Sequence, residues 1–177
     1  YYVTDTSEPE DAYNAIYVYS FNRPAVSEGD RITALSGTSV EFYGFTELSF
    51  PSWKVEETTE VPAPMAITLE NVNDDDAMEA MESGLVQVEN VVVCPIGEGF
   101  ESYGQWAVLV DQDGSCDSGE GAVNIVSSFN VPDVDPATLV GQQLPRIRGN
   151  LRYHMASRPP WIFYTRGPDD LELPAAK

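Results

Sequence analysis

The residues best suited to chemistry in this chain are five arginines and one histidine near its C-terminal end. The chain of 177 residues has 9 Lys and Arg against 29 Asp and Glu, a formal net charge of −20. Residues 141–168 nevertheless contain no Asp or Glu, and they hold Arg146, Arg148, Arg152, Arg158, Arg166 and the only histidine, His154. Guanidinium groups bind carboxylates and phosphates through paired hydrogen bonds. We call these six residues the arginine cluster, and they predict a site for an acidic partner.

A strand over residues 144–155 would place most of this cluster on one face, because side chains in a strand alternate between its two faces. The positions on that face are Arg146, Arg148, Asn150, Arg152 and His154. The intervening positions, Met155 among them, are expected to face the core. Trp161 and Arg166, in the next strand-forming run, are predicted to extend the cluster. Cations spaced in this way beside aromatic rings are typical of a groove for single-stranded nucleic acid.

Three roles remain open for the arginine cluster. It could dock onto the acidic first half of the chain, or onto an acidic surface of another domain or protein. It could bind single-stranded nucleic acid or another polyanion. It could also be a solvated face with no partner. We favour docking, because the rest of the chain is strongly acidic and an acidic protein repels nucleic acid at long range.

Catalytic signatures are absent from the sequence. It has no HExxH, no GxSxG and no phosphate-binding loop. A histidine-based triad would have to use His154, which lies among arginines that should lower its pKa and has no carboxylate nearby in the sequence. We therefore expect a protein that is not an enzyme and that needs no cofactor.

A calcium site is an alternative interpretation of the segment DQDGSCDSGEG at residues 111–121. Its oxygen ligands would be Asp111, Asp113, Asp117 and Glu120. The glycine at 114 comes too early for an EF-hand loop, and the flanking segments look like strands rather than helices. We expect an ordinary loop here, with calcium as the alternative.

Two cysteines, Cys94 and Cys116, complete the chemically distinctive residues. Neither belongs to a CxxC pair, and a single histidine does not complete a zinc site. We expect a disulfide between them, with two free thiols as the alternative. A disulfide predicts an oxidising, extracytoplasmic location, secreted or on the cell surface. No apolar run approaches the roughly 20 residues needed to cross a bilayer, so we expect no membrane insertion. The opening YYVTDTSEPE suggests a mature or trimmed chain whose targeting segment lay upstream.

The elements that must position these residues are mostly strands. Runs rich in Val, Ile, Tyr, Phe and Thr are separated by Gly, Pro, Asp and Ser. These runs are residues 15–21, 31–50, 85–94, 105–111, 122–129, 146–155 and 161–166. One helix is predicted at 73–84, with Met78 and Met81 on one face and Gly84 as its C-terminal stop. Residues 54–68 are predicted to be an extended connector.

An internal repeat organises these strands. Gly29 aligns with Gly141, and Gly37 with Gly149, each pair 112 residues apart. Asp5 also aligns with Asp111, and each is followed by a polar loop and a strand that begins at an alanine, Ala15 or Ala122. The sequence therefore predicts two copies of one β unit.

The second copy has five predicted strands, at 85–94, 105–111, 122–129, 144–155 and 160–166. Five such strands, with a glycine inside a long fourth one, favour the OB-fold, a small five-stranded barrel. The first copy begins at its second strand, so we expect its first strand to lie upstream of Tyr1. The predicted fold is all-β, with two tandem OB-like barrels. Residues 1–69 form the incomplete first barrel and connector, 70–84 a linking helix, and 85–177 the second barrel.

The chain also resembles a known group of proteins. EGDRITALSGTSVEFYGFTEL (28–48) and SGLVQVENVVV (83–93) carry most of the likeness, which extends over nearly the whole chain. They resemble the OB-like β-barrel region of secreted bacterial multidomain proteins, a region that often accompanies an extracellular endonuclease domain. The resemblance implies a non-catalytic binding or positioning module that contacts other domains. It also supports the alternative of a nucleic-acid-binding accessory module, and it supplies no catalytic residues.

Overall fold

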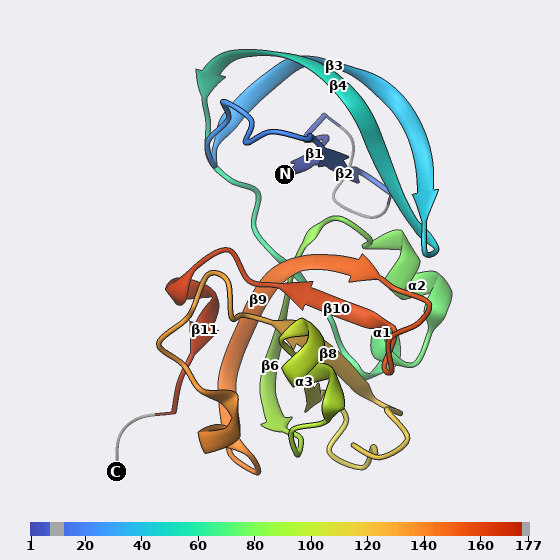
Figure 1. Cartoon of the computed structure of the whole chain (residues 1–177), viewed down its shortest axis with the longest axis vertical. Coiled ribbons are helices and arrows are strands. Elements are labelled where there is room, and N and C mark those ends of the chain that lie inside the picture. The colour runs from blue at the N-terminus through green and yellow to red at the C-terminus, as the bar shows by residue number, and fades with distance from the viewer. Residues whose placement is uncertain (8–12, 175–177) are drawn as a thin grey trace.

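The computed structural model describes residues 1–7 and 13–174. It consists mostly of strands, which form an open sheet near the N-terminus and a closed barrel near the C-terminus (Figure 1). Within the described residues, no helix is long and apolar enough to cross a membrane.

Five strands close the barrel. They are β6 (Leu85–Val93), β7 (Gln105–Leu109), β8 (Ala122–Val126), β9 (Gln143–Tyr153) and β10 (Trp161–Tyr164). The order around the barrel is β6-β7-β8-β10-β9, and β9 pairs with β6 to complete the circle. Neighbours are antiparallel except β8 and β10, which are parallel. Two short strands extend this sheet: β5 (Met65–Ala66) on β6 and β11 (Leu171–Glu172) on β9.

Alternation of apolar residues fills the interior of this barrel. Val88, Val108, Ile125, Ile147 and Phe163 are each fully or almost fully buried, one from each strand. Met155, expected in the core, lies beyond the end of β9 and is exposed. The 3-10 helix η1 (Pro136–Leu139) lies between β8 and β9, and η2 (Pro168–Asp170) lies just before β11.

The predicted single helix before the barrel is two short helices, α1 (Leu69–Val72) and α2 (Asp75–Ala80). Asp74 caps α2 by accepting hydrogen bonds from the backbone N–H groups of Asp76 and Ala77. Met78 is fully buried, as the pattern predicts. The expectation that Gly84 stops the helix is wrong: α2 ends at Ala80, and Gly84 instead lies against Met65 just before β6. A third helix, α3 (Glu98–Tyr103), connects β6 to β7.

The N-terminal sheet has four strands, β1 (Tyr2–Thr4), β2 (Ala15–Tyr19), β3 (Asp30–Phe42) and β4 (Phe45–Thr58), in the order β1-β2-β4-β3. β2 and β4 are parallel, and the other pairs are antiparallel. β4 extends into the segment predicted as a connector. Among the described residues, β1 and β3 form the two unpaired edges of this sheet, so it stays open and a second closed barrel is not formed.

Strand order and register show that the open sheet repeats four strands of the barrel. The order β1-β2-β4-β3 matches β7-β8-β10-β9, with the same parallel pair in the middle. Gly37 and Gly149, which the sequence alignment predicts to be equivalent, also have the same close neighbour. A Cβ on Gly37 would lie 2.8 Å from the carbonyl oxygen of Ser49, and one on Gly149 would lie 2.7 Å from that of Tyr164. In β1 and β7 the structural equivalence differs by one residue from the sequence alignment, which matches Asp5 with Asp111. Thr4 pairs with Ala15, and Leu109 pairs with Ala122, so Thr4 is the structural equivalent of Leu109.

Candidate functional site

Two arginines at the middle of β9 form ion pairs with carboxylates of the same chain. Arg146 lies 3.1 Å from the carboxylate of Glu172, and Arg148 lies 3.5 Å from that of Asp170. Arg148 also donates a hydrogen bond to the carbonyl oxygen of Asp169. These acceptors belong to η2 and β11, which follow the predicted strand pair and lie beside β9.

Arg166 has the strongest ionic contacts of the cluster. Its side chain donates to both carboxylate oxygens of Asp170, at 2.9 and 2.7 Å, and to Glu28 at 2.5 Å. Burial alone would raise the pKa of Asp170, but the hydrogen bonds from Arg166 outweigh burial and lower it. The same hydrogen bonds raise the pKa of Arg166. Because Glu28 precedes β3, this pair joins the barrel to the open sheet.

Arg152 lies among aromatic rings rather than carboxylates. Its guanidinium carbon is 4.7 Å from the ring centre of Phe45, and 5.8–5.9 Å from those of Tyr17, Phe42 and Tyr164. Three of these rings belong to the open sheet and one to β10. A cation within about 6 Å of an aromatic face is attracted to the negative charge of that face. Arg152 therefore contacts aromatic rings of both β units.

His154 continues this contact at the tip of the β3–β4 hairpin, which reaches the barrel in Figure 1. Its ring stacks on that of Tyr43, with centres 4.9 Å apart. The backbone N–H of Met155 donates to the carbonyl oxygen of Tyr43 at 3.1 Å. Partial burial lowers the pKa of His154, and the charge of Arg152 lowers it further. Both effects favour the neutral form of the ring.

Trp161 and Arg158, which were also predicted to be part of the arginine cluster or to extend it, lie apart from the contact between the two β units. Trp161 faces the barrel core with an exposed fraction of 4%, and its indole N–H donates to Asp75 of α2 at 3.3 Å. It is therefore a core residue and presents no face to a ligand. Arg158 donates to the carbonyl oxygens of Met155 and Ser157 in its own loop.

Glu82 was missed by the sequence analysis. Burial raises the pKa of Glu82 to about 7, although the nearby backbone N–H groups of Thr46 in β4 and Tyr153 in β9 oppose the shift. One glutamate among many gives no sequence signal of this kind. The aromatic residues around Arg152 were likewise unpredictable as a set, because they come from two repeats.

The acidic loop gives no metal cluster. Among the described residues, no three His, Cys, Asp or Glu side chains come together in a way that could hold a metal ion. Asp111 accepts from the backbone N–H of Asp113, and Ser115 forms an isolated bridge with Glu120. Cys116 in this loop is bonded to Cys94, which confirms the predicted disulfide. Calcium binding by Asp111, Asp113, Asp117 and Glu120 stays a prediction.

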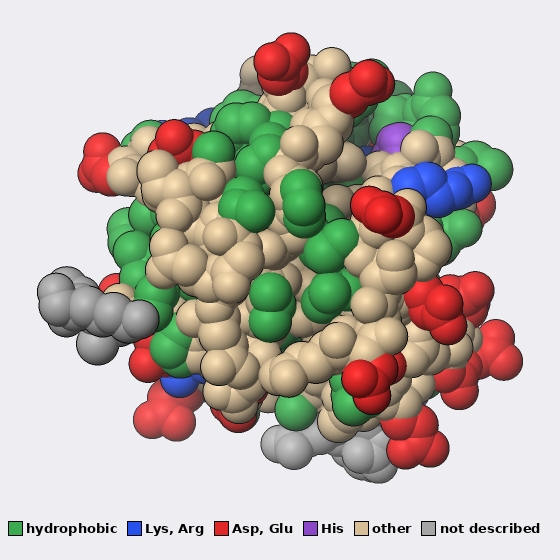
Figure 2. Space-filling model, turned by 90° about the horizontal axis from the view of Figure 1, so that it is seen from below, with side chains coloured by type: hydrophobic (Ala, Val, Ile, Leu, Met, Phe, Trp, Pro, Cys, Tyr) green, Lys and Arg blue, Asp and Glu red, His purple; other side chains and the backbone are tan. Residues whose placement is uncertain are grey.

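The distribution of charge also bears on polyanion binding. Figure 2, which views the molecule from the barrel end, shows acidic side chains spread around that face and few basic ones.

Comparison with family models, curated proteins and solved structures gives no match. The resemblance to secreted bacterial barrel regions therefore stays a prediction.

Proposed function

We propose that this chain is a non-catalytic positioning module, in which the arginine cluster fixes the open sheet against the barrel. The observation that carries this proposal is the position of Arg152 among rings of both units. Arg166 with Glu28 adds an ion pair across the same boundary, and Glu82 lies close enough to the backbone of Thr46 in β4 for that group to lower its pKa. Such a module would set the orientation of further domains or protein partners in a larger secreted or surface bacterial protein.

The OB-fold is part of this proposal. The barrel order β6-β7-β8-β10-β9, closed by β9 on β6, is the Greek-key arrangement of five strands that the OB-fold uses. The open sheet repeats four of those strands, so we infer that it derives from the same unit. The disulfide is compatible with the proposed extracytoplasmic location.

Binding of single-stranded nucleic acid by the same arginines is the alternative function. Arg146, Arg148 and Arg166 have carboxylate partners, and phosphates would have to displace those partners. The proposal therefore expects no salt-dependent binding of DNA. Calcium binding is the second alternative, and it expects a rise in melting temperature with calcium but not with magnesium.

The deciding experiment combines DNA binding with proteolysis of the connector at residues 59–64. Fluorescence anisotropy of labelled single-stranded DNA is measured at low salt for the wild type and for a variant with Arg146→Ala, Arg148→Ala and Arg152→Ala. Cleavage after Glu60 by a glutamyl endopeptidase is then followed for Arg152→Ala. Arg158→Ala is the matched control, because the side-chain hydrogen bonds of Arg158 in the described part of the chain stay within its own loop.

A positioning role predicts no DNA binding and at least fivefold faster cleavage in Arg152→Ala, with no change in Arg158→Ala. DNA binding that weakens steeply with salt and disappears in the triple variant would replace the proposal with the polyanion groove. Equal cleavage of Arg152→Ala and the wild type would show that this residue does not hold the two units together.

A further inference from the structure

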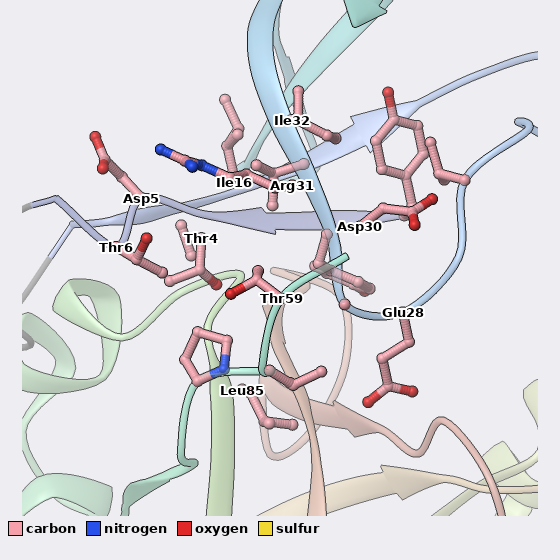
Figure 3. A pocket seen from close by; sticks show the side chains of 18 of the residues that line it. Thr4, Asp5, Thr6, Ile16, Glu28, Asp30, Arg31, Ile32, Thr59 and Leu85 are labelled. Atoms are coloured by element: carbon pink, nitrogen blue, oxygen red, sulfur yellow. The ribbon is translucent and has the colours of Figure 1, made fainter. Parts of the chain in front are cut away.

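The open sheet leaves a cavity where the closed barrel has a strand. In the barrel, β6 lies between β7 and β9 and is antiparallel to both. The equivalent strands of the open sheet are β1 and β3, and among the described residues no strand lies between them. A cavity of about 1250 Å³ occurs there, lined by β1, the first half of β3 and the connector. Figure 3 shows labelled side chains from these segments around it.

The register of the repeat predicts which residues would meet an added strand. β6 pairs with β9 over residues 143–150 and with Val108 and Leu109 of β7. The equivalent positions are 31–38 on β3, and Val3 and Thr4 on β1. The cavity is lined by both of these β1 residues and by β3 residues within that range.

The apolar residues at these positions are only partly covered. Leu144 and Ile147 of β9 face β6 residues and are fully buried, at 0% exposure. Their equivalents on β3, Ile32 and Leu35, are half-buried and line the cavity. In the barrel, Val91 and Val88 of β6 are the residues paired with those two positions. An added strand with apolar side chains at the same two places would therefore complete the burial.

The charge of the cavity defines the rest of the occupant. Asp5, Asp30 and Glu60 line it and have no ionic partner among the described residues, whereas Glu28 in the same lining is paired with Arg166 at 2.5 Å. Its two arginines are already paired, Arg31 with Glu57 at 2.5 Å and Arg166 with Asp170 at 2.7 Å. Because the unpaired charge is acidic, cationic side chains on the outward face of the occupant would be attracted to it.

We propose that the open sheet accepts one extended peptide strand, antiparallel to β1 and β3, with apolar residues facing Ile32 and Leu35 and cationic residues facing outward. This mode of recognition is β-strand addition, in which backbone hydrogen bonds supply affinity and alternate side chains supply specificity. Two free strand edges that flank one apolar cavity offer hydrogen bonds on both sides of the incoming strand. The proposal rests on strand geometry and does not depend on the contacts of Arg152, which lies outside the cavity lining.

The test uses a synthetic peptide with the sequence of residues 85–93, Glu89→Lys, and one added lysine at each end. Its binding to the intact protein is measured by calorimetry and by anisotropy of a labelled copy. We expect saturable one-to-one binding. A peptide with Val88→Asp and Val91→Asp should bind at least tenfold more weakly. A protein carrying Leu35→Asp should lose at least tenfold in affinity, whereas Phe129→Ser, an exposed apolar residue outside the cavity lining, should not.

A fusion keeps the proposal testable if Leu35→Asp does not fold or if the free peptide binds weakly. The same strand is joined ahead of Tyr1 by a linker as long as residues 94–104, the connection between β6 and β7. The fusion should raise the melting temperature and stop the free peptide from binding. Absence of both peptide binding and a fusion effect would overturn the proposal, as would binding that Val88→Asp and Val91→Asp do not change.

Two further outcomes are distinguishable. A dimer in solution that Leu35→Asp separates and the peptide does not dissociate would make a second copy of the chain the occupant, and would overturn the peptide proposal. Arg152 does not line the cavity, so Arg152→Ala reports on the contact of the two units alone. Failure of either proposal therefore leaves the other one standing.

Discussion

The guanidinium carbon of Arg152 lies 4.7 Å from the ring centre of Phe45, and these two residues belong to different repeats of the chain. Arg152 is on β9 of the barrel and Phe45 begins β4 of the open sheet. Phe45 is fully buried, and the Nε atom of Arg152 is buried without a hydrogen-bond partner. Removal of the cation would leave a space among the rings, whereas removal of a carboxylate-paired arginine at the surface would not.

Arg152→Ala should therefore destabilise the protein by about 2 kcal/mol, the value of a desolvated cation–π contact. Arg146→Ala is the matched control, and it should cost less than about 1 kcal/mol, because the Arg146–Glu172 pair is substantially exposed. Urea unfolding followed by tryptophan fluorescence measures both values. A larger loss in Arg146→Ala than in Arg152→Ala would contradict the assignment of Arg152 as the main contact.

Glu82 should make stability depend on pH. Its pKa is about 7 in the folded protein and 4.5 in its ordinary state, so the folded chain binds more protons between these values. Stability from this group is fully present below pH 4.5 and is lost as the pH rises through 7. Glu82→Gln removes the titration while keeping a polar side chain of nearly the same size and shape.

The free energy of unfolding of Glu82→Gln, relative to the wild type, should thus increase between pH 4.5 and pH 8 by about 1 kcal/mol, after allowance for solvent screening of this half-buried group. Denaturant unfolding at several pH values measures the difference. A pH-independent difference for Glu82→Gln would contradict its burial as a neutral group.

The Cys94–Cys116 disulfide should stabilise the barrel by restricting the unfolded chain. The two cysteines are 22 residues apart, and closure of a loop of this length contributes roughly 3 kcal/mol in the chain-entropy model. The double variant Cys94→Ala, Cys116→Ala should lose about that amount in urea unfolding. The wild type treated with a reducing agent should match the double variant, and unequal losses would show that the side chains also matter.

Gly149 should not accept an alanine. The added Cβ would lie 2.7 Å from the carbonyl oxygen of Tyr164, a backbone atom held in the β9–β10 pair. Overpacking of this kind costs about 1–3 kcal/mol. Gly97→Ala, where a Cβ has no neighbour within 4 Å, is the matched control and should be nearly neutral. Thermal unfolding compares the two, and Gly37→Ala should show the same sensitivity as Gly149→Ala if the two glycines are equivalent.

Period-two alternation and the repeated glycines were sufficient to predict a β protein with five strands near residues 85–166. Strand pairing depends on local chemistry here: branched and aromatic residues alternate with polar ones, and Gly37 and Gly149 fit close backbone contacts. The disulfide was predictable because the chain has only two cysteines, which leaves one possible pair. The end of α2 was mispredicted because Gly84 serves the packing of Met65 and not the helix.

The arginine cluster shows the limit of the sequence. Composition favoured acidic partners for its cations in so acidic a chain, but it left a polyanion and a solvated face open and did not predict the aromatic partners of Arg152. Only the tertiary structure decided which: η2 and β11 supply Asp170 and Glu172, and the open sheet supplies Glu28 and the rings around Arg152. The same is true of Trp161, which was predicted to extend the arginine cluster and instead lies in the core. Side-chain alternation is a local property of one strand, whereas the partner across a contact depends on how distant segments fold together.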